Sequence, residues 1–113
     1  MLSLVTAVIK PHMLESVNEA LKGAGVAGMT ITEVKGFGRQ GGHTETYRGA
    51  EYVIDFVPKL KVEVLVPSEE AGKVTSIVAS AAGTGKIGDG KIWVTSVDHV
   101  VRIRTGEMGV DAI

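Results

Sequence analysis

Two clusters of glycine give this 113-residue sequence its strongest chemical signal. They hold eight of its 15 glycines, at positions 36, 38, 41 and 42 and at positions 83, 85, 88 and 90. Neighbouring glycines let successive backbone N–H groups point into one concavity, and a nearby lysine adds a mobile positive charge. Because Lys86 and Lys91 accompany the second cluster, we predict a phosphate-binding loop over about residues 83–91.

Neither cluster satisfies a known nucleotide-binding motif. Residues 36–41 and 83–88 both match G-x-G-x-x-G, but a dinucleotide fingerprint must follow a strand and open a helix. The first cluster leaves a predicted strand for a loop, and the second joins a predicted helix to a strand. Residues 85–91 also imitate a P-loop, yet Ile92 stands where that motif needs Ser or Thr for magnesium. Rossmann and P-loop sites are therefore rejected.

Arg102 and Arg104 add to the positive charge that a phosphate would meet. With Lys86 and Lys91 they lie within 19 residues, and they share one face of the chain if residues 100–104 form a short fifth strand. The alternative is a solvated edge whose charges prevent aggregation. Asp89, inside the loop, is placed either to accept hydrogen bonds from a sugar hydroxyl or to cap the turn.

The segment from Phe37 to Pro58 is a second candidate for function. It shows neither helical nor alternating periodicity and is far longer than the two to five residues that a hairpin needs. Four of the chain's five aromatic residues lie in it, which is unusual for a disordered segment. We therefore predict a partner-binding loop, with a flexible hairpin tip as the alternative.

Hydrophobic patterns predict the elements that position these residues. Alternating or continuous apolar runs predict strands over residues 2–9, 29–35, 59–66 and 92–97. Apolar residues at helical spacing predict one helix over about residues 12–23 and a second from Ser68, as its N-cap, to Gly83. The order β-α-β-β-α-β is that of an α+β, ferredoxin-like sandwich with a long loop between its second and third strands. Because one sheet face and both edges need cover, we expect a homo-oligomer.

Composition and charge exclude several classes of function. The chain has no cysteine, hence no disulfide, zinc–thiolate site or Fe–S cluster, and its three histidines are too scattered for a His-rich metal site. A net charge of −1 argues against nonspecific nucleic-acid binding. Lys10 and Pro11 end the first apolar run well short of a signal peptide or membrane span, so we expect a single cytoplasmic domain over residues 1–113.

Several long runs resemble the PII nitrogen-regulatory signal-transduction proteins. They are GMTITEVKGFGRQ (28–40), GHTE (42–45), YRGAEY (47–52), TGKIGDGKIWV (84–94) and RIRTGE (102–107). The resemblance covers the whole chain. It implies a non-catalytic homotrimer that binds ATP or ADP between neighbouring subunits and controls nitrogen metabolism through its long loop.

The resemblance implies a role for each residue of a nucleotide site. The implied phosphate ligands are Gly88, Asp89, Gly90, Lys91, Arg102, Arg104 and Arg39 with its neighbour Gly38, and the implied adenine contacts are Thr30, Glu63 and the backbone near Leu65. Arginine suits this task because its fixed fork meets phosphate oxygens in two places.

The resemblance also implies a site for 2-oxoglutarate. Gln40 would coordinate a Mg²⁺ ion shared with ATP, Lys59 would pair with the distal carboxylate, and backbone groups from Gly38 to Gly42 would complete the site. ADP lacks the γ-phosphate that helps to hold the metal, so one effector would gate the other.

The long loop is the output that the resemblance implies. Tyr52 matches the family's nucleotidylated tyrosine, the target of a uridylyl- or adenylyltransferase. Arg48 matches the loop-tip arginine that blocks an ammonium channel. Ammonium transporters, which would recruit the protein to the membrane, and regulators of nitrogen metabolism are therefore the expected partners. Gly41, in place of a common lysine, and Ala50, in place of one branch's phosphorylated serine, depart from the family.

Two other classes of function compete with this reading. A small ATP-hydrolysing or phosphoryl-transfer enzyme could use the glycine loop and the arginines, but the sequence offers no convincing base or water-positioning residue. A structural trimer of the cation-tolerance type would bind no nucleotide.

Overall fold

Four antiparallel strands form the main sheet of the computed structural model, which describes residues 1–37, 43–47, 49–54 and 56–113. Across the sheet the order is β2-β5-β1-β6. The strands are β1 (Leu2–Ile9), β2 (Thr30–Gly36), β5 (Val57–Pro67) and β6 (Gly90–Val97). Each of the four predicted strands is confirmed to within two residues at either end.

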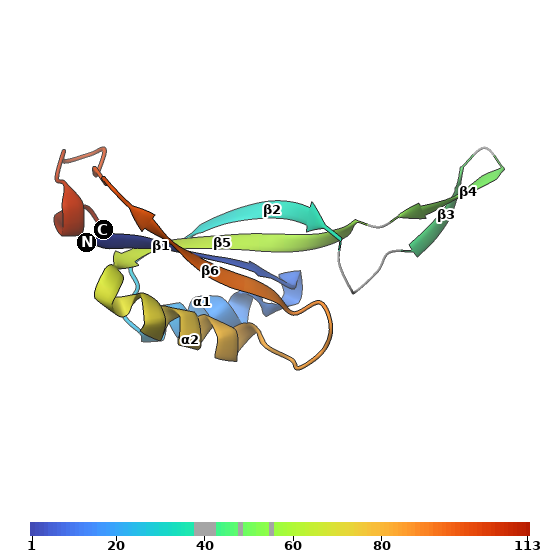
Figure 1. The fold of residues 1–113 in the computed structure, drawn as a ribbon, viewed down its shortest axis with the longest axis horizontal. Coiled ribbons are helices and arrows are strands. Elements are labelled where there is room, and N and C mark those ends of the chain that lie inside the picture. Colours follow the sequence, from blue (N-terminus) through green and yellow to red (C-terminus); the bar gives the residue numbers. More distant parts are fainter. Residues whose placement is uncertain (38–42, 48, 55) are drawn as a thin grey trace.

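Both helices cover the same face of this sheet (Figure 1). The first, α1 (Leu14–Gly23), follows a 3-10 turn at Pro11–Met13, and the second, α2, spans Ala71–Ala82. Burial of apolar side chains between the layers is the main driving force for this arrangement. The buried core contains Val5, Ala7, Ile9, Val17, Leu21, Val62, Val64, Val66, Ala71, Val74, Val78 and Ala82. The chain thus has the predicted α+β, ferredoxin-like βαββαβ fold.

Ser68 does not cap the second helix as predicted. Its hydroxyl oxygen lies 2.7 Å from the hydroxyl oxygen of Ser3, so it is engaged across the end of the sheet. Residues Ser68–Glu70 form a 3-10 turn, and α2 begins after it. The other end of the prediction is confirmed, because Gly83 is the C-terminal cap of α2.

The segment predicted as an irregular loop contains a β-hairpin. Its strands are β3 (His43–Tyr47) and β4 (Ala50–Ile54), which pair antiparallel with Tyr47 opposite Ala50. The hairpin projects beyond the end of the main sheet (Figure 1). Gly49 has a φ of 78°, a left-handed conformation that the tight turns of hairpins require. The predicted loop is also shorter than expected, because β5 begins at Val57.

The predicted fifth strand over residues 100–104 is wrong. Val101 forms one isolated bridge with Met108, and the backbone N–H of Gly106 donates to the carbonyl oxygen of Arg102 over 2.8 Å. Gly106 has a φ of 74°, so the chain reverses direction there. A short 3-10 helix at Gly109–Ala112 follows. Among the residues that the structure describes, no helix is long and apolar enough to cross a membrane.

Candidate ligand-binding site

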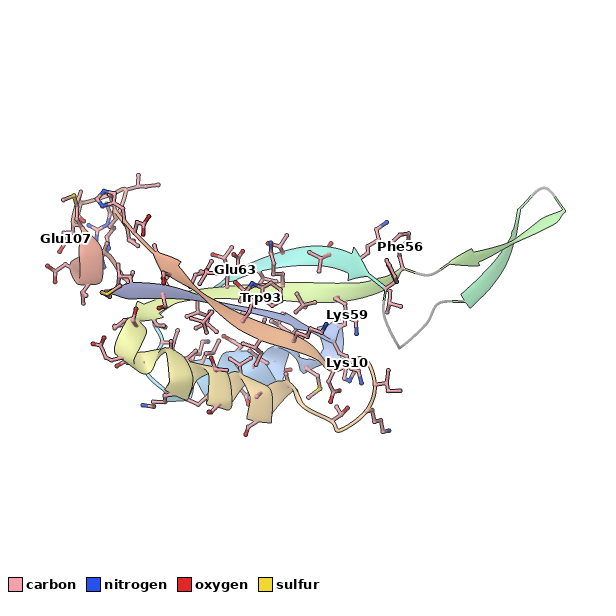
Figure 2. All side chains as sticks on the ribbon, viewed as in Figure 1. Lys10, Phe56, Lys59, Glu63, Trp93 and Glu107 are labelled. Carbon is pink, nitrogen blue, oxygen red and sulfur yellow. The ribbon has the colours of Figure 1, made fainter. Side chains whose placement is uncertain are left out.

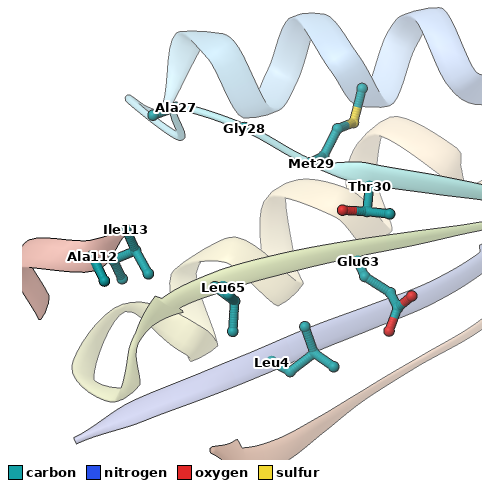
Figure 3. Close-up of a pocket in the computed structure, with 9 residues that line it drawn as sticks. All are labelled: Leu4, Ala27, Gly28, Met29, Thr30, Glu63, Leu65, Ala112 and Ile113. Atoms are coloured by element: carbon teal, nitrogen blue, oxygen red, sulfur yellow. The ribbon is translucent and has the colours of Figure 1, made fainter. Parts of the chain in front are cut away.

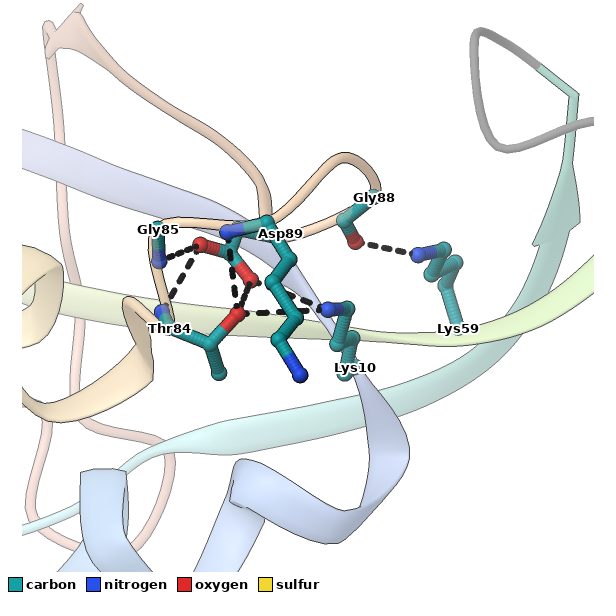
Figure 4. Close-up of polar contacts among 7 residues, drawn as sticks. Lys10, Lys59, Thr84, Gly85, Gly88 and Asp89 are labelled. Carbon is teal, nitrogen blue, oxygen red and sulfur yellow. Dashed lines mark hydrogen bonds and ion pairs between the residues drawn. The ribbon is translucent and has the colours of Figure 1, made fainter.

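Asp89 organises the glycine loop between α2 and β6. Its Oδ2 accepts hydrogen bonds from the backbone N–H groups of Thr84 (2.7 Å) and Gly85 (2.8 Å), and its Oδ1 accepts one from the Thr84 hydroxyl. Figure 4 shows these contacts closing the loop on itself. The hydrogen bonds from the hydroxyl and the N–H of Thr84 hold the pKa of the Asp89 carboxyl well below its usual range. Asp89 therefore caps the turn, which is one of the two roles predicted for it.

Gly90 allows this loop to enter the sheet at close range. It has a φ of 106°, and a Cβ atom there would lie 1.7 Å from the carbonyl oxygen of Val8. Gly85 and Gly88 also have left-handed φ values, of 81° and 95°. Side chains are strained in this region of conformational space. Glycine avoids this strain, and at Gly90 it also avoids the close contact with β1.

Two lysines meet the loop from neighbouring strands. The Nζ of Lys10, which follows β1, lies 3.0 Å from Asp89 Oδ1 and donates to the Thr84 hydroxyl over 3.4 Å. Lys59, on β5, donates from Nζ to the carbonyl oxygen of Gly88 (Figure 4). Desolvation, and then the charge of Lys10, lower the pKa of the Lys59 ammonium, while Asp89 acts in the opposite direction. This corner is suited to hold an anion.

A groove lies at the other end of the sheet, on the face opposite the helices. Its volume is about 550 Å³, and the close-up in Figure 3 shows its lining. The lining residues are Leu4, Ala27, Gly28, Met29, Thr30, Glu63, Leu65, Ala112 and Ile113. The strand register brings residues of three strands together in the groove, because Thr30 pairs with Glu63 and Leu4 pairs with Leu65. Apolar walls with one hydroxyl and one carboxylate suit a flat heteroaromatic ring with donor groups at its edge.

The structure therefore brings together the three residues predicted to contact adenine. It separates the residues predicted to hold the phosphates. The glycine loop and Lys91 lie at the Gly90 end of β6, and Arg102 and Arg104 follow its other end, about 23 Å away at about 3.3 Å per residue. Figure 2 shows the same separation, with Lys10 and Lys59 at one end and Glu107 at the other.

Arg102 is also engaged locally. Its Nη1 lies 2.9 Å from Oε1 of Glu107, across the turn that replaces the predicted strand. Ala112 and Ile113 of the same C-terminal segment line the groove. The segment that carries both arginines thus belongs to the groove end of the molecule.

Five predicted site residues lie outside the described residues. They are Gly38, Arg39, Gln40, Gly42 and Arg48. Tyr52 is described through its backbone, which pairs with Glu45 in the hairpin. Within the described ranges no three His, Asp or Glu side chains gather as a metal site.

Lys10 and Thr84 are site residues that sequence reasoning missed. Lys10 served only to end an apolar run, and Thr84 was one unassigned position in a glycine cluster. The antiparallel register places Ile9 opposite Gly90, so the end of β1 meets the start of β6. The sequence did offer one signal for Lys10. A lysine at the end of a predicted strand can lie beside a predicted phosphate-binding loop.

Fold and site together define a class of protein. It is a small ferredoxin-like domain with a groove at one end of its sheet, a lysine-flanked glycine loop at the other, and a projecting hairpin. The family model described as "Nitrogen regulatory protein P-II" matches residues 2–107. The chain belongs to this family, whose members are nitrogen-regulatory signal proteins and not enzymes.

Individual relatives agree with this assignment. The chain is 60% identical to the nitrogen regulatory protein P-II of Rhizobium meliloti (strain 1021) over 109 residues, which are 96% of this chain and 97% of the relative. It is 58% identical to that of Azospirillum brasilense over the same shares. The crystal structure of Arabidopsis thaliana PII bound to citrate superposes with a TM-score of 0.82 at 35% identity, covering 99% of this chain and 92% of that chain.

Proposed function

We propose that this protein senses adenine nucleotides and 2-oxoglutarate and reports their levels to nitrogen-metabolism partners through its hairpin. The observation that carries the proposal is the groove formed by Thr30, Glu63 and Leu65 together with a capped, lysine-flanked glycine loop. The groove accounts for an adenine ring, and the loop with Lys91 accounts for phosphates.

The active assembly is a homotrimer with sites between its subunits. The groove and the arginine segment lie at one end of the chain, and the glycine loop lies at the other. One nucleotide can reach both halves of the site when they come from two adjacent copies. The open face of the sheet supports such an assembly, because Leu65 and Trp93 remain 38% and 44% exposed in the single chain.

The 2-oxoglutarate site adjoins the phosphates of ATP. Lys59 pairs with the distal carboxylate, and Gln40 with backbone groups from Gly38 to Gly42 holds the remainder and the Mg²⁺ ion. When bound, the metal would supply positive charge to the anionic groups of the two ligands. Since ADP has one phosphate fewer, it supports this site poorly, and the two effectors are coupled.

The hairpin delivers the output. The hairpin projects from the sandwich, so a partner can bind it without contacting the sandwich. Nucleotidylation of Tyr52 by a uridylyl- or adenylyltransferase adds charge and bulk to this surface. Arg48 enters the exit of an ammonium transporter, which brings the cytoplasmic protein to the membrane.

Calorimetric titration of 2-oxoglutarate tests the proposal. The purified protein is titrated with saturating Mg-ATP, with ADP, and without nucleotide. We expect saturable heat with Mg-ATP and little or none in the other two titrations. No 2-oxoglutarate binding with Mg-ATP would refute the carbon-sensing part, and no binding of either nucleotide would refute the whole proposal.

A further inference from the structure

Two ammonium groups and one carboxylate meet at the glycine loop. Lys10 reaches Asp89, with 3.0 Å between Nζ and Oδ1, and both side chains are largely shielded from solvent. Lys59 reaches the carbonyl oxygen of Gly88, the residue immediately before Asp89 (Figure 4). Lys10 rather than Lys59 therefore forms the ion pair with Asp89.

An ammonium group has three N–H donors. Among the described residues, the Lys59 ammonium uses one of them, in its bond to Gly88. The charges of Lys10 and Asp89 both act on Lys59, in opposite directions. Without Lys10, the nearby carboxylate would attract Lys59, because opposite charges in a partly desolvated site associate. A Lys59–Asp89 pair would then compete with any incoming carboxylate for the same ammonium group.

We propose that Lys10 is a positioning residue which, by holding the carboxylate of Asp89, keeps Lys59 available to a dicarboxylate ligand. The inference rests on the proposed function in one respect, since the ligand is taken to be 2-oxoglutarate. Lys10 acts through Asp89 and does not itself contact the ligand. The role of Lys10 can therefore be tested by the position of Lys59 in the unliganded protein and by the affinity for 2-oxoglutarate.

The first test needs no ligand. Crystal structures are determined for Lys10→Met and for Lys73→Met, a matched loss of one exposed lysine near the start of α2. We expect Lys59 Nζ to move within ion-pair distance of the Asp89 carboxylate in Lys10→Met and to stay on Gly88 in Lys73→Met. A Lys59 that stays on Gly88 in Lys10→Met overturns the proposal.

The second test measures the affinity for 2-oxoglutarate at saturating Mg-ATP. We expect Lys10→Met to weaken binding about tenfold, while Lys10→Arg, which keeps the charge, restores it to within about threefold of the parent protein. In the Asp89→Asn background the same Lys10→Met change should cost less than about threefold, because the competing carboxylate is gone. An equal loss in both backgrounds overturns the proposal. If the parent protein binds no 2-oxoglutarate, the proposed function fails, and the crystal structures alone decide the role of Lys10.

Discussion

Replacing Gly90 with alanine tests whether close backbone approach determines the shape of the glycine loop. The new Cβ would lie 1.7 Å from the carbonyl oxygen of Val8 and 2.9 Å from its carbonyl carbon, so β1 and β6 must separate. A φ of 106° adds backbone strain of about 1–2 kcal/mol. The steric overlap adds about 1–3 kcal/mol, as overpacking does elsewhere. We expect the free energy of unfolding to fall by about 2–5 kcal/mol.

Gly85→Ala is the matched control. Its φ of 81° is also left-handed, but among the described residues no atom beyond its two chain neighbours lies within 4 Å of the new Cβ. This variant should lose only the strain, about 1–2 kcal/mol. Both variants are compared by urea denaturation at one fixed protein concentration, because oligomer stability depends on concentration. Equal losses in the two variants would refute the argument from close approach.

Three further predictions concern single side chains. Asp89→Asn should destabilise the protein at neutral pH, and the difference should shrink as the pH falls below about 4. The pKa of Asp89 is lowered on folding, so its contribution is complete above the ordinary pKa of about 3.9 and is lost progressively as the pH falls toward the folded value. Thermal denaturation of both proteins between pH 7 and pH 2 measures this, and a difference that grows in acid would contradict it. Lys59→Met should weaken 2-oxoglutarate binding at least tenfold and leave ATP affinity within about threefold, as calorimetry can show; an equal loss for both ligands would argue against its assignment. Glu107→Gln should change the free energy of unfolding by less than about 1 kcal/mol, because its 2.9 Å pair with Arg102 is exposed to solvent; denaturant titration would reveal a larger loss.

The fold was predictable where one physical signal dominated. Val62 and Val64 alternate with the polar residues Lys61 and Glu63, and the burial of both valines in the core is what that alternation predicts. Val17 and Leu21 lie one helical turn apart, and both are buried against the sheet. These patterns set the order and faces of the elements without reference to distant contacts.

The predictions from sequence were wrong where contacts between distant residues, or weak local patterns, determined the structure. The hairpin strands mix polar residues such as Thr44 and Glu45 with few aliphatic ones, so alternation of hydrophobicity could not reveal them. Ser68 follows local capping rules, but a partner 65 residues away, Ser3, takes its hydroxyl. The turn at Gly106 broke the extended stretch on which the pairing of Arg102 and Arg104 depended.

The candidate site was predictable in its parts but not in its assembly. Glycine and lysine spacing identified the loop over residues 83–91, and its conformation depends on glycine as expected. Family resemblance alone brought Thr30, Glu63 and Leu65 into one group, because their proximity depends on the register of two strands, β2 and β5. Lys10 was missed for the same reason, since its partner lies 79 positions along the chain.

The projecting hairpin has an evolutionary consequence. β3 and β4 pair with each other in a sheet of their own and add no strand to the four-stranded sheet. Mutations in the hairpin can therefore accumulate with little loss of folding stability. Mutations in the sandwich are more often destabilising, because its side chains are packed in the core. The sequence of the hairpin can therefore diverge between lineages while the sandwich stays unchanged.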